Sequence, residues 1–347
     1  MERVCKADLL KVFNENQEEL TGFLHNILPF FPLQLKELLK SLPKDKLSEL
    51  EEIRLRVGKP LACQIGVKTF WITLTGEIVK PFTGEPFFVD MELLQKVIAL
   101  VSNSSFYAIE TELSQGYLTL PGGHRVGFTG EAVIANGNLI SLKNLNSLNF
   151  RIAKEIVGVA DYLIPSLIDH QRERVYHTLI ISPPGAGKTT MLRDLIRQFS
   201  DGIPGLLNGV NIGLVDERSE LAGSYRGIPQ NDLGYQTDVL DGCPKALGMI
   251  ILLRSMSPKI IAVDELGRTD DVNAILEIIN AGVTILATVH GYGFHELRER
   301  PVMGDLIRKK VFERYVVLSQ RLGPGTIEAI LDETGSQKNI NIFGRGK

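Results

Sequence analysis

A run of nine residues has the types and the spacing of a phosphate-binding loop. It reads Ser182, Pro183, Pro184, Gly185, Ala186, Gly187, Lys188, Thr189 and Thr190. Glycines let successive backbone N–H groups turn toward a phosphate, and the helix that follows directs its positive end at the same charge. We therefore expect Lys188 to contact the β and γ phosphates of a nucleoside triphosphate and the Thr189 hydroxyl to bind Mg²⁺.

One position of this loop departs from the usual pattern G-x-x-x-x-G-K-[ST]. Ser182 stands where the first glycine is expected, and because serine is small the loop should tolerate it. The alternative interpretation is a glycine-rich turn between a strand and a helix, with Lys188 in solvent. The apolar run before the loop and the amphipathic stretch after it favour phosphate binding.

An acidic pair, Asp264 and Glu265, follows a second apolar run at residues 260–263. An aspartate at the carboxyl end of a buried strand can hold the Mg²⁺ shell, since ligands gather at that edge of an open α/β sheet. Glu265 can then act as the general base that activates water, which favours hydrolysis. The alternative is an acidic helix cap after a buried strand.

Two further apolar runs end in polar side chains. Residues 212–215 lead to Asp216, Glu217 and Arg218, and residues 283–289 lead to His290. A single histidine is more often an ordinary core or surface residue, but four strand ends that deliver such groups to one sheet edge favour a site. A metal site at Asp238, Asp241 and Cys243 is the weaker interpretation of that segment, because loop carboxylates before a helix usually cap it and Pro244 suits a first helical position.

These side chains need a particular scaffold. Four β-branched apolar runs, at residues 178–181, 212–215, 260–263 and 283–289, alternate with helical stretches, and a helix is expected at 160–171. Continuous apolar strands that alternate with helices predict an α/β fold with a parallel sheet covered on both faces. This P-loop core is expected over residues 151–347, with a tail that frays from about 337.

The first 150 residues follow a different pattern. Helical spacing up to about residue 50 gives way to short alternating strands from Ile53, a helix at 91–101, and hairpin turns such as Asn136-Gly137. We predict an α+β domain over residues 1–150, in which helices precede an antiparallel meander. Asparagines between 144 and 149 interrupt the pattern and suggest a hinge to the second domain.

Composition excludes several classes of protein. The 347 residues carry 38 Lys+Arg against 41 Asp+Glu, a net charge of −3, which argues against a nucleic-acid-coating protein. Cys5, Cys63 and Cys243 have no CxxC spacing, so neither a disulfide framework nor a zinc site is expected. The apolar run 246–253 is far shorter than the roughly 20 residues of a membrane span, and no signal peptide is evident. A cytoplasmic protein without its own transmembrane span is expected.

The order of these motifs resembles that of the type II/IV secretion ATPases, and Leu253-Arg254 before Pro258 adds to the likeness. The chain as a whole, from about residue 30 to 335, is more similar to the stage III sporulation protein AA family of endospore-forming bacteria. Three stretches carry that second resemblance: 52–61, 122–127 and 216–221.

The resemblance implies a RecA-like P-loop ATPase that works as a ring, expected to be a hexamer, with ATP and Mg²⁺ between two domains and a neighbouring subunit. It implies that Glu217, beside Asp216, places water and metal and that His290 senses the γ phosphate. It also implies an arginine that supplies positive charge there. Candidates for that arginine are Arg54, Arg56, Arg125, Arg151 and Arg254, each of which could instead be a solvated surface residue.

Together these features predict an ATP-hydrolysing motor that energises or assembles the channel between mother cell and forespore. It would act from the mother-cell cytoplasm, held at the membrane by embedded channel proteins. Two alternatives remain open at this point. One is a nucleic-acid translocase, which the charge balance and the lack of a long basic run disfavour. The other is a scaffold that binds nucleotide to close a ring without turnover.

Overall fold

The structure, a computed structural model, describes residues 26–66, 68–81, 83–103, 113–114 and 116–338. Cys5 and the part of the predicted frayed tail from residue 339 on lie outside these ranges. The chain divides into two compact units, Met1–Lys154 and Glu155–Lys347, here called unit 1 and unit 2.

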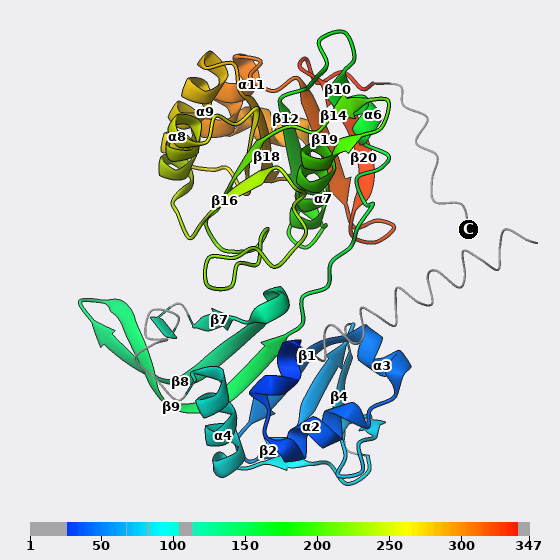
Figure 1. Ribbon diagram of the computed structural model, residues 1–347, viewed down its shortest axis with the longest axis vertical. Helices are drawn as coiled ribbons and strands as arrows, with labels where there is room; N and C mark the ends of the chain where they lie inside the picture. The colour runs from blue at the N-terminus through cyan, green and yellow to red at the C-terminus, as the bar shows by residue number, and fades with distance from the viewer. Residues whose placement is uncertain (1–25, 67, 82, 104–112, 115, 339–347) are drawn as a thin grey trace, which may run out of the picture. The chain divides into compact units, whose positions relative to one another are not determined.

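Unit 1 is built on an antiparallel sheet of seven strands in the order β5-β4-β3-β1-β9-β8-β7 (Figure 1). Its strands are β1 (Leu50–Arg56), β3 (Ala62–Ile65), β4 (Lys68–Ile72), β5 (Ile78–Val79), β7 (Tyr117–Thr119), β8 (Arg125–Ala135) and β9 (Asn138–Arg151), and a short ladder pairs β2 (Lys59–Pro60) with β6 (Phe88–Val89). Its helices are α2 (Leu33–Lys40), α3 (Lys44–Glu49) and α4 (Met91–Val101), with 3₁₀ turns η1 (Leu28–Phe30) and η3 (Pro121–Gly123). The predicted meander and the helix at 91–101 are confirmed, and the Asp90 side chain caps that helix by accepting the Leu93 N–H at 2.7 Å.

The predicted hinge at 144–149 is wrong, because these residues lie inside β9, and residues 147–149 pair with both β1 and β8. Asn144 has a φ of 47°, and the pairing of β8 with β9 shifts register between Thr129 and Glu131. Asparagine tolerates positive φ better than other side chains, so it suits an irregular position in a strand. The asparagine run therefore marks a β-bulge within a continuous hairpin.

His124 is a buried histidine that ties the start of β8 to the end of unit 1. Its Nδ1 accepts the backbone N–H of Ala153 at 3.0 Å, and only 4% of the residue is exposed. Burial lowers the pKa of His124 from 6.5 to about 4. The His124 imidazole is therefore neutral in the folded protein at pH values above about 4.

This burial predicts a pH-dependent stability. Between pH 6.5 and about 4 the unfolded chain binds a proton at His124 that the folded chain does not, so this stability is complete above pH 6.5 and is lost as pH falls toward 4. The loss is at most about 3 kcal/mol. Urea unfolding at pH 7 and pH 5 should show a smaller loss in His124→Gln than in the wild type. The control is His295→Gln, which replaces an exposed histidine and should keep the wild-type pH dependence. Equal pH dependence in the wild type and His124→Gln would show that burial of His124 is not the cause.

Unit 2 is a three-layer α/β structure around a seven-stranded sheet of order β16-β15-β17-β18-β12-β19-β20. The strands are β12 (Thr178–Ser182), β15 (Ile212–Asp216), β16 (Thr237–Asp241), β17 (Ile260–Val263), β18 (Thr284–His290), β19 (Arg314–Ser319) and β20 (Thr326–Asp332). The helices are α6 (Ile164–Leu167), α7 (Lys188–Asp201), α8 (Lys245–Ser255), α9 (Thr269–Asn280), α10 (Phe294–Glu299) and α11 (Pro301–Arg308). All neighbouring strands run parallel except β19 and β20, so the predicted parallel sheet is confirmed.

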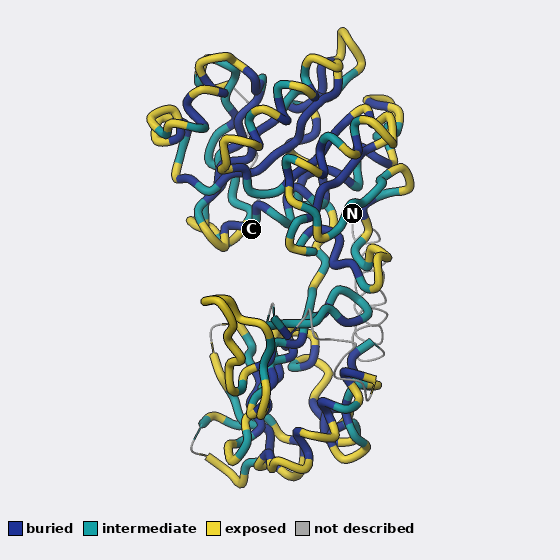
Figure 2. The backbone as a smooth tube through the Cα atoms, turned by 90° about the vertical axis from the view of Figure 1, so that its left-hand side faces the viewer, coloured by how far each residue is buried: buried dark blue, intermediate teal, exposed yellow. Residues whose placement is uncertain are grey.

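Side chains that alternate along the strands enter two separate cores. On one face Ile180 and Leu214 pack with α7, and on the other Ile181 and Val263 pack with α8, α9, α10 and α11. The central strands are buried along their length (Figure 2). Burial on both faces explains why these strands are continuously apolar in sequence.

Two expectations about unit 2 are wrong. The helix expected at 160–171 is only the four-residue α6, followed by a hairpin of β10 (Ile168–Asp169) and β11 (Arg174–Val175). The Asp169 carboxylate accepts the N–H groups of Gln171 and Arg172, which stabilises a turn in place of a helix. Asp238 and Asp241, expected in a flexible loop, lie in β16.

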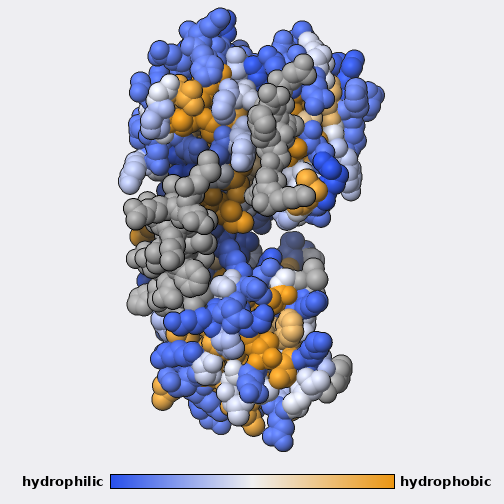
Figure 3. Space-filling model, turned by 90° about the vertical axis from the view of Figure 1, so that its right-hand side faces the viewer, coloured by the Kyte–Doolittle hydropathy of each residue, from blue (hydrophilic) through white to orange (hydrophobic). Residues whose placement is uncertain are grey.

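A second small hairpin joins β13 (Gly202–Ile203) to β14 (Leu207–Asn208). The face drawn in Figure 3 is largely hydrophilic, with hydrophobic patches on each unit. In the ranges that the structure describes, no helix is both long and apolar enough to cross a bilayer.

Candidate active site

The predicted phosphate-binding loop joins the buried strand β12 to helix α7. Gly185 and Gly187 have φ angles of 73° and 86°, which side chains rarely adopt. A Cβ on Gly187 would lie 3.0 Å from the backbone nitrogen of Gly325, so a side chain here would be crowded as well as strained. The buried Ser182 hydroxyl donates to the carbonyl of Pro183 at 2.7 Å. Serine therefore fits the loop and makes an internal hydrogen bond in it.

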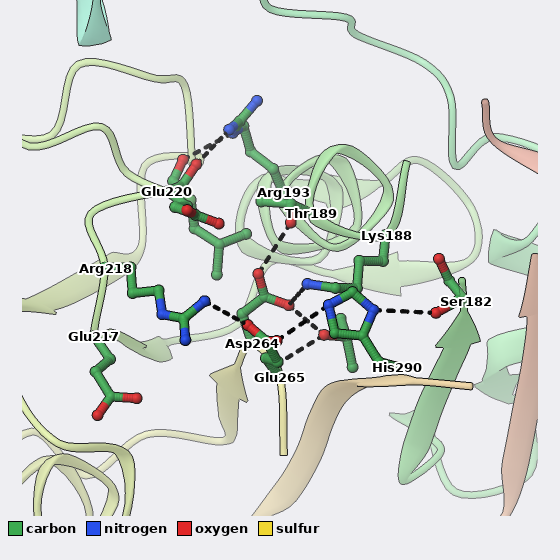
Figure 4. Close-up of polar contacts among 12 residues, drawn as sticks. Ser182, Lys188, Thr189, Arg193, Glu217, Arg218, Glu220, Asp264, Glu265 and His290 are labelled. Carbon is green, nitrogen blue, oxygen red and sulfur yellow. Dashed lines mark hydrogen bonds and ion pairs between the residues drawn. The ribbon is translucent and has the colours of Figure 1, made fainter. Parts of the chain in front are cut away.

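Asp264, directly after β17, joins this loop to the rest of the site (Figure 4). Its Oδ1 accepts the Lys188 ammonium at 3.1 Å and its Oδ2 accepts the Thr189 hydroxyl at 3.0 Å. The hydroxyl of the fully buried Thr288, on β18, also donates to Oδ1. The structure thus brings together Lys188, Thr189 and Asp264 as the sequence predicts.

The donor set at this point fits Mg²⁺. A hydroxyl and a carboxylate from facing elements supply oxygen ligands, and Mg²⁺ in nucleotide sites takes one or two protein ligands and fills the rest of its shell with phosphate oxygens and water. Thr189 and Asp264 already lie within 3.0 Å of each other. They are therefore the residues that would hold the metal.

Glu265 is held by three contacts in an unusual backbone conformation. Its φ of 59° is in the left-handed region, and strain of this kind in a non-glycine residue is often found at functional sites. Its N–H donates to the Thr288 hydroxyl at 2.9 Å, and its carboxylate lies 3.1 Å from both Arg218 Nη1 and His290 Nε2. The Glu265 side chain is 27% exposed, so water can reach it.

His290 lies at the end of β18 and bridges two strand ends. Its Nε2 faces the Glu265 carboxylate and its Nδ1 lies 3.4 Å from the Ser182 carbonyl (Figure 4). Both ring nitrogens therefore face acceptor oxygens. The carboxyl ends of β12, β17 and β18 meet here, as expected of a ligand site in an open α/β sheet.

Asp216 has a structural role in the loop after β15. Its buried carboxylate accepts the backbone N–H groups of Glu220, Leu221 and Ala222 at 2.8 to 2.9 Å. Burial raises the pKa of Asp216, although these hydrogen bonds act in the opposite direction. Arg193 of α7 donates to the carbonyls of Glu220 and Leu221 at 2.7 and 2.8 Å. The acidic segment is therefore fixed to the helix that follows the phosphate loop.

Two predicted catalytic residues do not join Asp264. Glu217 forms an ion pair with Lys245 at the start of α8, and Figure 4 shows its carboxylate directed away from Asp264. Arg254 is exposed at the last turn of α8, which leads to the start of β17, so it lies at the opposite edge of the sheet. Within one chain, α8 runs antiparallel to the strands and carries Arg254 away from their carboxyl ends, so its role as the arginine at the γ phosphate stays a prediction.

Three residues that contact the site or the acidic segment after β15 have no role predicted from the sequence: Arg193, Arg218 and Thr288. Arg218 follows the acidic pair after β15, and Thr288 stands in the run that ends in His290, so both were visible as strand-end groups. Arg193 lies five residues beyond Lys188 on α7, where an arginine on a helix surface carries no specific signal.

The four arginines proposed from unit 1 gather on one face of its sheet. Arg54 and Arg56 are two residues apart on β1 and therefore point to the same face of the sheet. Arg151 of β9 lies opposite Glu52, which shares that face, and Arg125 of β8 lies opposite Arg151. Glu52 accepts Arg54 Nε at 2.7 Å, and Arg125 lies 4.7 Å from the Tyr117 ring centroid. These arginines form a cluster within unit 1.

Comparison with known proteins identifies close relatives. The family model described as sporulation stage III, protein AA matches residues 24–338. Stage III sporulation protein AA of Bacillus subtilis (strain 168) is 39% identical over 317 residues, which covers 90% of this chain and 96% of that protein.

Solved structures support the fold. The ATPase DotB of Legionella pneumophila aligns with a TM-score of 0.53 at 16% identity, covering 83% of this chain and 76% of that one. The Yersinia pseudotuberculosis ATPase DotB aligns with a TM-score of 0.51 at 14% identity, covering 83% and 75%. The predicted P-loop α/β core with a smaller α+β unit before it is confirmed.

Proposed function

The chain belongs to the sporulation stage III, protein AA family, and from this membership we propose that it is a motor that hydrolyses ATP to ADP and phosphate during endospore formation. The observation that carries the proposal is the contact of Asp264 with both Lys188 and Thr189, with Glu265 as the next residue. Lysine, hydroxyl, metal-binding carboxylate and general base are the groups that nucleotide hydrolysis requires.

In the proposed reaction Lys188 binds the β and γ phosphates, and Thr189 and Asp264 hold Mg²⁺. When bound, Mg²⁺ would offset the negative charge of the phosphate oxygens. Glu265 accepts a proton from water, the water oxygen bonds to the γ phosphorus, and the bond from that phosphorus to the bridging oxygen breaks to leave ADP. His290 lies against Glu265 and responds to loss of the γ phosphate.

We also propose the assembly in which this chemistry is used. By its resemblance to the secretion ATPases, the chain forms a ring of six, in which an arginine from the unit 1 cluster or a neighbour approaches the γ phosphate. The ring acts in the mother cell and is held at the membrane by channel proteins, where it energises or assembles the channel to the forespore. The family and the Bacillus relative support the sporulation role.

Phosphate release by the purified protein tests the activity. We expect release that depends on Mg²⁺ and rises more steeply than in proportion to protein concentration, because ring assembly follows mass action. EDTA should stop release. Absence of release at every protein concentration, with ATP still bound, would contradict the motor and favour a nucleotide-gated scaffold.

A further inference from the structure

A cavity lies beside Glu265, on the side away from Lys188 (Figure 4). It has a volume of about 470 Å³ and lies among the ends of β15, β17 and β18. Glu265 and His290 line this cavity. Both also lie next to the phosphate loop, because Glu265 follows Asp264, which contacts Lys188, and His290 Nδ1 lies 3.4 Å from the Ser182 carbonyl. We call this cavity the arginine cavity, and its charged lining consists of Glu217, Arg218, Lys245, Glu265, Arg268, His290 and Arg300.

The arginine cavity has an excess of positive charge. Four cationic side chains and two carboxylates line it, a formal balance of +2 without His290, and the adjacent Glu296 that pairs with Arg300 reduces the balance to +1. Lys245 pairs with Glu217, Arg218 with Glu265, and Arg300 with Glu296, a carboxylate outside the lining. Arg268 is exposed, and none of the ion pairs found around this cavity in the described ranges includes it. An anion is the ligand that this lining favours.

Two helices add to this charge. α8, of 11 residues, begins at Lys245, and α11, of 8 residues, begins directly after Arg300. Neither has an acidic residue in its first turn, so the positive end of each helix dipole is not offset there, although Pro301 at the start of α11 has no N–H to donate. α9 also begins here, but Asp271 already accepts the N–H groups of Gly267 and Arg268.

We propose that the arginine cavity binds inorganic phosphate after it leaves the hydrolysis site. The inference rests on the proposed ATPase for the source of the phosphate. Glu265 and His290 stand between the two sites, and movement of either side chain would connect them. Arg268 then offers a planar guanidinium that suits phosphate oxygens, whereas Arg300 already donates to Glu296 and to the His290 carbonyl.

Phosphate binding can be measured without turnover. The phosphate loop also binds anions, so the experiment uses full-length Lys188→Ala as the background and titrates it with inorganic phosphate by calorimetry. We expect millimolar binding that weakens at least about fivefold in Lys188→Ala with Arg268→Ala, since a charged hydrogen-bond partner is lost. Arg268→Glu should weaken it further.

The matched control is Arg298→Ala, which removes an exposed arginine of α10 that does not line the cavity. It should leave phosphate affinity within about twofold, because only the net charge changes. Equal weakening by Arg298→Ala, or no binding in the Lys188→Ala background, would overturn the inference. If phosphate binds as expected but the wild type releases none from ATP, the cavity stands as an anion site and only the ATPase proposal fails.

Discussion

Replacing Glu265 with glutamine is expected to lower ATP turnover by at least about 100-fold while Mg·ATP still binds. A positioned general base contributes about 10² to 10⁴ in rate, and an amide of the same shape cannot accept the proton from water. Glutamine keeps the size of the side chain and can still accept from Arg218, so the fold should be retained. Phosphate release and binding of a fluorescent ATP analogue, measured on the same sample, separate the two effects.

Glu299→Gln is the control for that experiment. Glu299 is exposed on α10, and its substitution removes the same charge from a position outside the site. Its turnover should equal that of the wild type. Retention of more than about a tenth of wild-type turnover in Glu265→Gln would show that another group activates water.

Lys188→Ala should have the largest effect on binding. Lys188 lies nine-tenths buried against Asp264, so its loss removes the cation for the phosphates and leaves a carboxylate facing them. Lys188 and the bound phosphates would form a buried charged pair. Truncating one partner of such a pair costs at least about 2 kcal/mol, which corresponds to an affinity for ATP about 30-fold lower. Equilibrium binding of labelled ATP in the presence of Mg²⁺ measures it.

A suitable control is Lys259→Ala, which removes an exposed lysine just before β17, at the opposite edge of the sheet. ATP affinity should be unchanged in that variant. If Lys188→Ala bound ATP as tightly as Lys259→Ala, the loop would be a structural turn, as the alternative interpretation of the sequence holds.

The sequence predicted the parallel core because burial on both faces leaves a direct trace in apolar runs. The run at 260–263 is β17 itself, and the loop at Gly187 and the acidic residue Asp264 follow from the same rule that polar groups gather at strand ends. Strands β16 and β19 carry charged residues such as Asp238 and Arg314 and were not predicted. Their pairing is decided by tertiary contacts that periodicity does not contain.

The side-chain directions in the site were the least predictable part. Glu217 and Glu265 have similar settings in sequence, each beside an aspartate after an apolar run, yet one binds Lys245 and the other Arg218 and His290. The difference depends on a left-handed backbone at Glu265 and on where α8 begins. Neither feature has a local signal in the residue types.

Ser182 and the two prolines after it have a consequence for the entropy of nucleotide binding. Each proline ring fixes one backbone angle, and the Ser182 hydroxyl bonds to the carbonyl of Pro183. A loop with all glycines at its start would sample many conformations when empty and would lose that freedom on binding. Here much of that freedom is already absent from the empty loop, so more of the contact energy with phosphate remains as affinity.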